Sequence, residues 1–548
     1  MPVSTLNIPR QADIDPWPYL KDVKLHDIHA SVDLLIGTDA PKALEPWEVI
    51  NSQNEGPYAV RTRVGWVING PLHGGSCRSK SGYSSVTANR ISVEHLQEML
   101  VKQYHHDFNE RSSEEQIEMS REDIKFMDIV SSTAKLIEGH YCIDLPFRKE
   151  NVTLPDNRYI AEQRLCSLKR KFDRNSEFRG EYTTFLSDMI AQQYAEPVPP
   201  DQLTQSNGKV WYIPHHGVYH PQKGKLRVVF DCAASYKGTS LNSQLLQGPD
   251  LTNNLIGVLV RFRQEPIAIV ADIQSMFHQV QVSDKHINFL RFLWWPNGNT
   301  AQAPQEYRMK VHLFGAASSP SCANYALRRT ADDNAEHFPP EVVSTVKNNF
   351  YVDDCLCSMA SEEEAEKMIQ ELTALCHKGG FTLSKWVSNS RAVLRSVSES
   401  HRAKDMMELD LDTDQLPVER TLGLQWCVET DQFGFKASAQ ERPQTRRGIL
   451  SVVSSLYDPL GFLAPFSMMA KMLLQELCRK NLGWDEAIPH FLSKQWADWL
   501  EDLQKVAEFK IDHCIKPKDF SNPVTAQLHH FSDASEVGYV LFKTGKEQ

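Results

Sequence analysis

The chain has 548 residues, 41% of them hydrophobic, and a formal net charge of −11, so at roughly 150 residues per domain we expect three or four domains with sizeable cores. The acidic balance argues mildly against nucleic acid as a partner, because neutralising phosphates takes Lys and Arg, and the scattered spacing of the 11 cysteines indicates neither a zinc site nor a disulfide framework. No apolar run approaches the ~20 residues that span a bilayer and no signal-peptide core opens the chain, so we expect a soluble protein without a membrane partner, in the cytoplasm or in an intracellular particle.

Residues 1–135 predict a small β-rich region followed by a linker. Residues 32–39 and 65–71 are each typical of a short strand that ends in a glycine turn. Residues 76–135 are polar and rich in Ser, Glu and Gln, which indicates a linker. Within it, the apolar spacing over residues 92–105 predicts one short amphipathic helix.

The next segment combines helical and strand patterns with a local excess of positive charge. Residues 159–175 and 180–196 are expected to be helices, and residues 210–214 and 225–231 strands, with a hairpin turn at 220–224. A basic groove is compatible with an acidic protein, because the local field decides binding. A solvated helix face explains the first basic cluster about equally well. The two clusters are Arg164, Lys169, Arg170, Lys171, Arg174 and Arg179, and Lys223, Lys225 and Arg227.

Three aspartates stand at the ends of predicted buried strands. An apolar run over residues 266–271 leads into Asp272, and a second β-prone stretch carries Asp353 and Asp354 in a tight turn. Taken alone, Asp272 is equally well a helix cap, and an Asp-Asp pair is usually a wet turn. Together, three such carboxylates can hold two Mg²⁺ (or Mn²⁺) ions, which clamp the attacking and leaving oxygens of a phosphoryl transfer. This pattern favours nucleotidyl transfer.

The remaining elements have the patterns of a scaffold. Residues 361–380 have a capping box, a buried apolar stripe and a terminal Gly-Gly, which predict a helix, and residues 381–386 predict the following strand. Further on, Trp484, Trp496 and Trp499 indicate packed helices.

The motif Tyr351-Val352-Asp353-Asp354 resembles the Tyr-x-Asp-Asp box of reverse transcriptases, and Asp272 lies upstream of it where that family has its first catalytic aspartate. Over nearly its whole length the chain resembles the polyprotein of BEL/Pao-type long-terminal-repeat retrotransposons. The resemblance implies an α+β fold, a right-hand polymerase with fingers, palm and thumb. It implies RNA-directed DNA polymerase activity, with Asp272, Asp353 and Asp354 as catalytic, metal-binding residues.

The same resemblance implies further site residues. Arg227 and the weaker candidate Lys225 fall where basic residues grip the incoming triphosphate, although an edge-strand arginine without a ligand is the alternative. Phe277 falls under the sugar of the nucleotide, unless it is a core residue, and Lys385 near the triphosphate, unless it is an exposed strand lysine. The remaining implied contacts are Gly315 and Tyr351 with the nucleotide, and Gly423 and Trp426 in the hairpin that holds the primer end.

By resemblance, residues 1–75 are the truncated end of an aspartic protease, residues 136–390 the fingers and palm, residues 391–520 a Pao-type thumb and connection, and residues 521–548 the start of a ribonuclease H-like domain. Because no Asp-Thr-Gly or Asp-Ser-Gly loop occurs, proteolysis is not expected. Asp533 would be the first metal ligand of an incomplete ribonuclease H-like site. The implied partners are an RNA or DNA template with its primer and deoxynucleoside triphosphates. The alternative is a catalytically inactive or domesticated fragment that binds nucleic acid.

Overall fold

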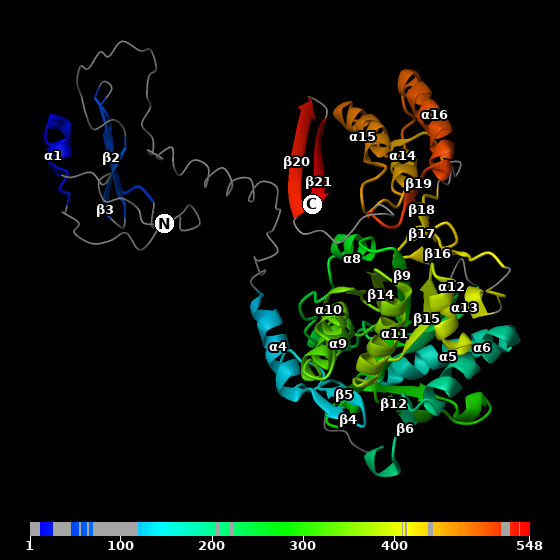
Figure 1. The fold of residues 1–548 in the computed structure, drawn as a ribbon. Helices are drawn as coiled ribbons and strands as arrows, with labels where there is room; N and C mark the ends of the chain where they lie inside the picture. The colour runs from blue at the N-terminus through cyan, green and yellow to red at the C-terminus, as the bar shows by residue number, and fades with distance from the viewer. Residues whose placement is uncertain are drawn as a thin grey trace. The chain divides into compact units, whose positions relative to one another are not determined.

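The structure is a computed structural model, and the chain divides into two compact units, Met1–Ile117 and Glu118–Gln548 (Figure 1). The second unit contains every residue predicted to act on a nucleotide. The structure describes residues 11–25, 45–53, 56–62, 65–69, 119–203, 208–219, 224–407, 409–411, 414–436, 442–516, 526–535 and 538–547.

The first unit contains a three-stranded antiparallel sheet in the order β1-β2-β3. Its small core is formed by Ile14, Leu20, Val23 and Ala59. The strand predicted at 65–71 is confirmed as β3, whereas the strand at 32–39 and the helix at 92–105 lie outside the described residues. The elements are α1 (Gln11–Ile14), a 3₁₀ helix at Pro18–Leu20, β1 (Glu48–Ile50), β2 (Tyr58–Thr62) and β3 (Gly65–Asn69).

The centre of the second unit is a four-stranded antiparallel sheet in the order β13-β14-β9-β15. The apolar run before Asp272 forms β9, as predicted, because Val, Ile and Ala alternate between two buried faces. Residues 350–351 and 354–359 form a hairpin around a two-residue turn, also as predicted. The strands are β9 (Ile267–Ile273), β13 (Phe350–Tyr351), β14 (Asp354–Met359) and β15 (Leu383–Ser388).

One face of this sheet packs against a layer of helices. Ile269, Ala271 and Ile273 of β9 share a core with Cys355 and Cys357 of β14. The helix predicted at 361–380 is confirmed as α11, capped by the Ser361 side chain. The helices are α4 (Arg121–Thr133), α9 (Ser319–Asp333), α10 (Pro340–Asn348) and α11 (Glu362–His377) (Figure 1).

The opposite face carries the alternate residues of the same strands. Ala268 of β9 and Leu356 of β14 pack there with Trp426. Because side chains alternate along a strand, Asp272 and Asp354 belong to this face, where each strand leaves the core. The covering elements are α8 (Leu255–Phe262), α12 (Arg391–Ser396), a 3₁₀ helix at Glu399–His401, α13 (Lys404–Met407), β16 (Val418–Thr421), β17 (Leu424–Cys427), β18 (Gln432–Gly434) and β19 (Lys510–Asp512).

The part of the second unit that corresponds to the predicted fingers has its own aromatic core, which contains Trp211, Trp294 and Phe292. The helices predicted at 159–175 and 180–196 are confirmed, with the second beginning earlier. The strand predicted at 210–214 is wrong: the strand begins after Pro214, as β7, which pairs with β8. The elements are α5 (Arg158–Arg174), α6 (Ser176–Ala191), β6 (Ala195–Pro197), a 3₁₀ helix at Pro200–Gln202, β7 (His215–Tyr219), β8 (Leu226–Phe230), α7 (Leu241–Gln244), 3₁₀ helices at Met276–Gln279, Ile287–Leu290 and Pro296–Gly298, β11 (Arg291–Trp294) and β12 (Gln305–Met309).

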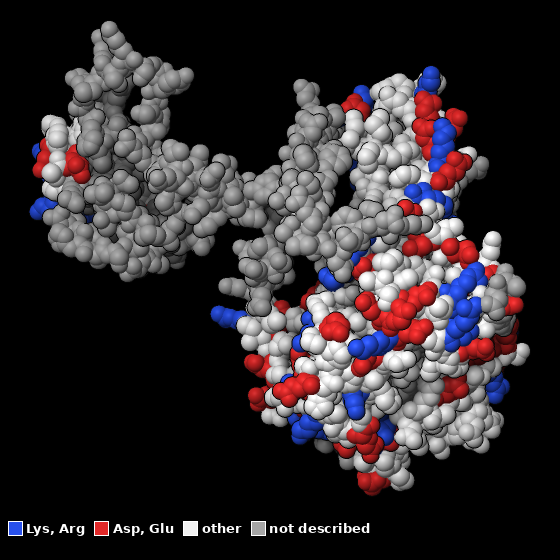
Figure 2. All heavy atoms as spheres, in the orientation of Figure 1, with Lys and Arg blue, Asp and Glu red and all other residues white. Residues whose placement is uncertain are grey.

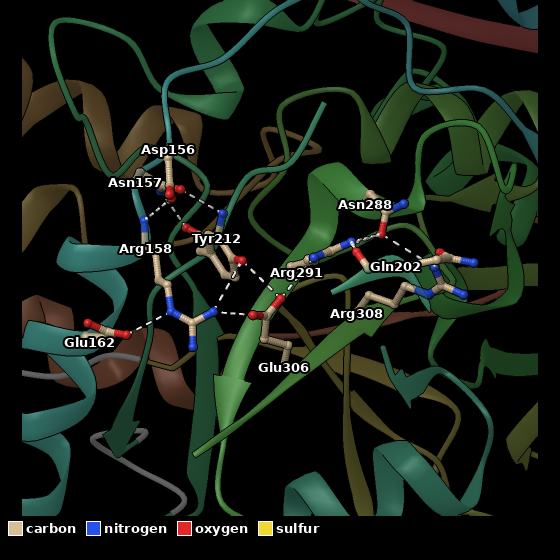
Figure 3. A network of polar contacts seen from close by, with 10 residues as sticks. All are labelled: Asp156, Asn157, Arg158, Glu162, Gln202, Tyr212, Asn288, Arg291, Glu306 and Arg308. Atoms are coloured by element: carbon tan, nitrogen blue, oxygen red, sulfur yellow. Dashed lines mark hydrogen bonds and ion pairs between the residues drawn. The ribbon is translucent and has the colours of Figure 1, made fainter. Parts of the chain in front are cut away.

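A buried polar network connects the elements of this fingers region (Figure 3). The guanidinium of Arg291, with no exposed surface, donates to Glu306 at 2.9 Å and to Asn288. Arg158 at the start of α5 and the Tyr212 hydroxyl donate to the same Glu306 carboxylate. The network therefore joins α5, the segment before β7 and the β11–β12 pair, with every charge partnered.

At least four of the six basic residues on α5 and α6 are engaged within the protein, including Arg170, which donates to the Cys166 carbonyl and the Ser167 hydroxyl. Lys169 donates to the Thr300 carbonyl at 2.7 Å, Arg179 to the Gly298 carbonyl at 3.2 Å, and the Lys171 ammonium lies 4.0 Å from the centre of the Phe178 ring. On the face shown in Figure 2, Lys and Arg are interspersed with Asp and Glu over the coloured residues. The first basic cluster is thus partly structural.

The boundary predicted at residue 136 is too late. Residues 121–133, placed in the predicted linker, form α4, whose capping box joins Ser120 and Asp123. Phe126 and Val130 of α4 are fully buried in the palm core, and β5 pairs in parallel with β10. The ordered unit therefore includes α4, β4 (Lys135–Ile137), β5 (His140–Ile143) and β10 (Gln281–Val282).

The C-terminal part is a group of helices with its own core, in which Trp496 and Trp499 are buried as predicted and Trp484 is 48% exposed, contrary to the prediction. None of the described helices is long and apolar enough to cross a membrane. The elements are α14 (Arg446–Val453), α15 (Ala464–Arg479), α16 (His490–Lys505), a 3₁₀ helix at Val506–Glu508, and a hairpin of β20 (Ala526–Ser535) and β21 (Gly538–Glu547).

Candidate active site

The structure brings together the three aspartates that the sequence singled out. Asp272 on β9 and Asp354 on β14 are direct cross-strand partners, so their side chains leave the sheet on the same face. Asp353 precedes Asp354 in the turn, and its carbonyl accepts a hydrogen bond from the Ile273 amide at 2.8 Å. This bond ties the turn to the end of β9 and fixes all three acids at one edge.

The turn that carries Asp353 has an unusual backbone. Val352 has φ of +58°, a left-handed conformation that is a genuine outlier for a β-branched residue. A two-residue hairpin with the right twist needs positive φ, which is why Gly and Asn are its usual residues. Such outliers persist where the surrounding structure holds them, and they gather at functional sites.

The electrostatics of the acids favour a cation. Burial, together with the neighbouring Asp353 and Asp272, raises the pKa of Asp354 to about 7. Burial also raises the pKa of Asp353, with Asp272 adding to the effect. Like charges in a partly desolvated site disfavour ionisation unless positive charge is supplied.

In this structure the positive charge comes from Lys385. Its ammonium lies 2.8 Å from Oδ1 of Asp272, although the lysine side chain is 62% exposed. Lys385 has φ of +57° at an irregularity of β15, between Ser384 and Val387 in the pairing with β9. The predicted lysine therefore meets a catalytic aspartate candidate directly.

The donor set fits Mg²⁺ or Mn²⁺, because it consists of carboxylate oxygens, which these hard cations prefer. The crowded charge of Asp353 and Asp354 fits a divalent ion in the same way. Within the described residues, no three His, Cys, Asp or Glu side chains are grouped closely enough to form a ready-made metal site. Asp272, Asp353 and Asp354 are the residues that would hold the ion.

Beyond Asp272 the predicted aromatic residue is half-buried and packs against the palm core. Phe277, in the 3₁₀ helix Met276–Gln279, is partly buried, and its ring centroid lies 5.6 Å from that of Phe314. Phe314 is 68% exposed. The two rings form an aromatic patch, in which Phe277 lies five residues after Asp272.

Gly315 is fixed by close packing. A Cβ there would lie 2.6 Å from the Phe230 carbonyl oxygen, and its φ is +116°. The Asn242 side chain donates to the Gly315 carbonyl at 3.0 Å and accepts from the Ala317 amide at 2.9 Å. Since Phe230 ends β8, this loop abuts the predicted fingers hairpin.

The predicted triphosphate residues lie on that hairpin. Arg227, opposite Val218 in the β7–β8 pairing, has an exposed side chain, while its neighbours Leu226 and Val228 pack inward. Lys225, just before β8, is also exposed. Their position matches the prediction of an accessible basic pair, and their role stays a prediction.

The predicted primer hairpin exists, but one of its residues cannot face a ligand. Leu422 and Gly423 form the turn between β16 and β17, with φ of +48° and +87°. Trp426 is completely buried against Phe262, and its indole N–H donates to Asp431 at 3.0 Å. The prediction that Trp426 contacts the primer is therefore wrong; the indole supports the hairpin from the core.

Sequence reasoning missed two contributors. Asn242 holds the Gly315 loop, and no local pattern identifies it. Tyr457 lies against Gly423, since a Cβ on that glycine would lie 2.7 Å from Cε1 of the ring. Asp533 lies on β20, opposite Val540; its side chain is outside the described residues, so its role stays a prediction.

Comparison with known proteins identifies two parts of the chain. Residues 220–386 match the reverse transcriptase (RNA-dependent DNA polymerase) family. Residues 445–542 match the Pao retrotransposon-like RNaseH-like domain, a match that begins upstream of residue 521 and includes α14 to α16. No curated protein matches the chain.

Among solved structures, the chain is similar to a foamy viral protease-reverse transcriptase in complex with double-stranded DNA. The TM-score is 0.40 at 13% sequence identity, and the alignment covers 84% of this chain and 70% of the viral one.

Proposed function

Since the chain carries a reverse transcriptase region of the Pao retrotransposon type, an RNA-directed DNA polymerase, we propose that it extends a primer on a template at the carboxylates of Asp272, Asp353 and Asp354. The observation that carries this proposal is the direct pairing of Asp272 with Asp354, with Asp353 tied to the end of β9. This pairing brings acids that are far apart in the sequence to one edge of the sheet.

The three carboxylates would hold two Mg²⁺ ions. When bound, these ions would supply the positive charge that stabilises the attacking and leaving oxygens in nucleotidyl transfer. The chain itself contributes fixed carboxylates, since β9 and the β13–β14 turn are held by buried strands. Lys385 partly neutralises Asp272, and Arg227 on the exposed hairpin would bond two phosphate oxygens of a deoxynucleoside triphosphate through its planar fork.

The aromatic patch would set the choice of sugar. Phe277 lies five positions after Asp272 and packs against Phe314, which limits its movement. A ring held under the sugar would leave no room for a 2′-hydroxyl and would so favour deoxynucleotides.

Residues 1–75 remain, by the same resemblance, the end of an aspartic protease without its catalytic loop.

The proposal is tested by primer extension with the full chain. We expect wild type to extend a DNA primer on an RNA template with Mg²⁺, and Asp353→Asn to lose at least about a thousandfold of that rate, since removing one carboxylate weakens the metal clamp. Asp405→Asn, an exposed acid of α13, is the matched control and should extend normally. Undiminished extension by Asp353→Asn would exclude this site.

The second candidate function, a protein that binds nucleic acid without polymerising, gives a different result. Wild type would then bind a template-primer duplex and add no nucleotide at any Mg²⁺ or Mn²⁺ concentration. The positive charge of Arg227 and Lys225 on the exposed hairpin is compatible with either function, so the extension assay decides between them.

A further inference from the structure

The part of the chain that matches the Pao family contacts the β16–β17 hairpin through the loop between α14 and α15. Residues 454–463, between α14 and α15, lie outside the reverse transcriptase match and inside the Pao match. Tyr457 in this loop contacts Gly423 at the tip of the β16–β17 hairpin. The loop of the Pao match therefore meets the hairpin at one turn.

The loop is held in place on both sides. The Asp458 carboxylate accepts the amide hydrogens of Phe462 at 3.0 Å and Leu463 at 2.6 Å, which closes the loop on itself. Leu460 packs against the core that contains Trp426, while Phe462 packs against the C-terminal core. The Arg263 guanidinium also lies 4.9 Å from the centre of the Phe462 ring. Tyr457 thus projects from a fixed base.

The Tyr457 ring has one covered side and one open side. Gly423 Cα lies so close that an added Cβ would be 2.7 Å from the ring, yet 46% of the residue is exposed. Burial raises the pKa of the Tyr457 hydroxyl, and the charge of Tyr351 adds to that effect. Tyr351 is in turn the cross-strand partner of Asp354.

Tyr351 and the acids lie on one face of the central sheet, and Leu460 of the loop packs against the core on that face. Tyr351 packs on the sheet face that carries Trp426, and the alternation of β9 and β14 directs Asp272 and Asp354 to the same face. An exposed aromatic ring supported by a rigid turn, beside a cluster of acids, suits the sugar and base of a strand end better than a triphosphate, which acids repel.

We propose that Tyr457 is a positioning residue for the terminal nucleotide of the primer strand, so that the Pao-type region completes the polymerase site. The proposal rests on the function proposed above. The ring would stack on the last nucleotide and hold its 3′ end toward Asp354, and stacking of this kind changes affinity by about tenfold or more per base. The hydroxyl is not required for this role.

Binding without turnover tests this directly. In an Asp353→Asn background, which cannot extend the primer, fluorescence anisotropy would measure the Kd for a recessed template-primer duplex. Tyr457→Ala should weaken binding by about tenfold, and Tyr457→Phe should stay within about twofold of the parent, because the ring is kept. Phe491→Ala, which removes a 55% exposed ring from α16, is the control and should bind like the parent.

A primer that lacks its terminal base separates stacking from a structural effect. If the ring stacks on that base, removing the base should weaken binding in the parent but much less in Tyr457→Ala, so the two losses should not add. In the extending enzyme, Tyr457→Ala should raise KM for template-primer more than it lowers kcat. Equal, additive losses, or an unchanged Kd in Tyr457→Ala, would overturn the proposal.

Two glycine variants provide a matched pair. Glu138–Gly139, between β4 and β5, is a turn with the same pair of positive φ angles as Leu422–Gly423, but nothing lies within 4 Å of an added Cβ at Gly139. Gly423→Ala should displace Tyr457 and weaken binding as Tyr457→Ala does, whereas Gly139→Ala should introduce the same backbone strain without affecting binding.

The two proposals fail in different ways. Absence of extension by the wild-type chain would remove the proposed function, while the anisotropy comparison would still report on Tyr457. Normal extension together with wild-type primer affinity in Tyr457→Ala and Gly423→Ala would leave the function standing and remove the role of the Pao-type loop.

Discussion

The ammonium of Lys385 lies 2.8 Å from a carboxylate oxygen of Asp272, across the boundary between β15 and β9. The lysine thus forms an ion pair with a carboxylate that the proposed metal ions need. At the same site, burial and the neighbouring acids raise the pKa of Asp354 to about 7. Asp272 can accept a divalent ion fully only if this ion pair loosens. The pair therefore sets a competition between a lysine of the chain and the metal.

Lys385→Met should tighten Mg²⁺ binding in the absence of nucleotide. Because the lysine is exposed, its pairing is weak, and removing it should improve the apparent Kd by about two- to fivefold. Calorimetric titration with Mn²⁺ or Mg²⁺ measures this. Lys347→Met is the control, since Lys347 forms a comparable ion pair with Asp332 on α9. Unchanged or weaker metal binding in Lys385→Met would show that the ammonium does not compete.

The buried network of Figure 3 predicts a large and specific loss of stability. Glu306→Gln leaves the fully buried Arg291 without its countercharge, which should lower the free energy of unfolding by about 3–5 kcal/mol. Glu162→Gln removes the exposed partner of Arg158 in the same network and should cost less than about 0.5 kcal/mol. Urea denaturation of both variants measures the difference. Similar losses would mean that the burial of Arg291 does not dominate.

His215 should make the fold sensitive to acid. Its Nε2 donates to the Leu293 carbonyl at 2.9 Å, so Nδ1 accepts from the Tyr182 hydroxyl. Burial lowers the pKa of His215 from 6.5 to about 4. Above pH 6.5 the contribution of His215 to stability is complete. As the pH falls from 6.5 toward 4, this histidine binds a proton in the unfolded chain but stays neutral in the folded one, so the free energy of unfolding decreases.

The test is the pH dependence of the urea midpoint. His215→Gln should remove on the order of 3 kcal/mol of the loss between pH 6.5 and 4, at about 1.4 kcal/mol per pH unit. His216→Gln, its exposed neighbour, should keep the wild-type slope. A residual slope remains because burial also lowers the pKa of His278, His286 and His312. Identical profiles for both variants would assign the acid sensitivity elsewhere.

Local patterns located the central elements well, because each carried its own physical signal. The apolar alternation before Asp272 and the β-prone residues around Asp353 define strands whatever the rest of the chain does. Their convergence was expected from the carboxylate pattern together with the resemblance. The register that pairs Asp272 with Asp354 was visible in neither sequence segment alone.

The errors came from features that depend on partners far along the chain. Residues 210–214 have strand-forming side chains, but a strand needs a ladder, and β8 offers one only after Pro214. Burial of Trp426 depends on Phe262 and the covering hairpin, so a local pattern cannot show it. Helix α4 did carry a signal, Ser120 followed by Asp123, which the polar composition of the surrounding segment concealed.

The parallel pairing of β5 with β10 determines how the protein can be divided for expression. A fragment starting at residue 220, where the reverse transcriptase match begins, lacks α4 and β5 and so opens the edge of β10 and the apolar surface that Phe126 covers. Unpaired strand edges beside exposed core favour aggregation. Biochemical work on the polymerase should therefore begin the fragment before Ser120.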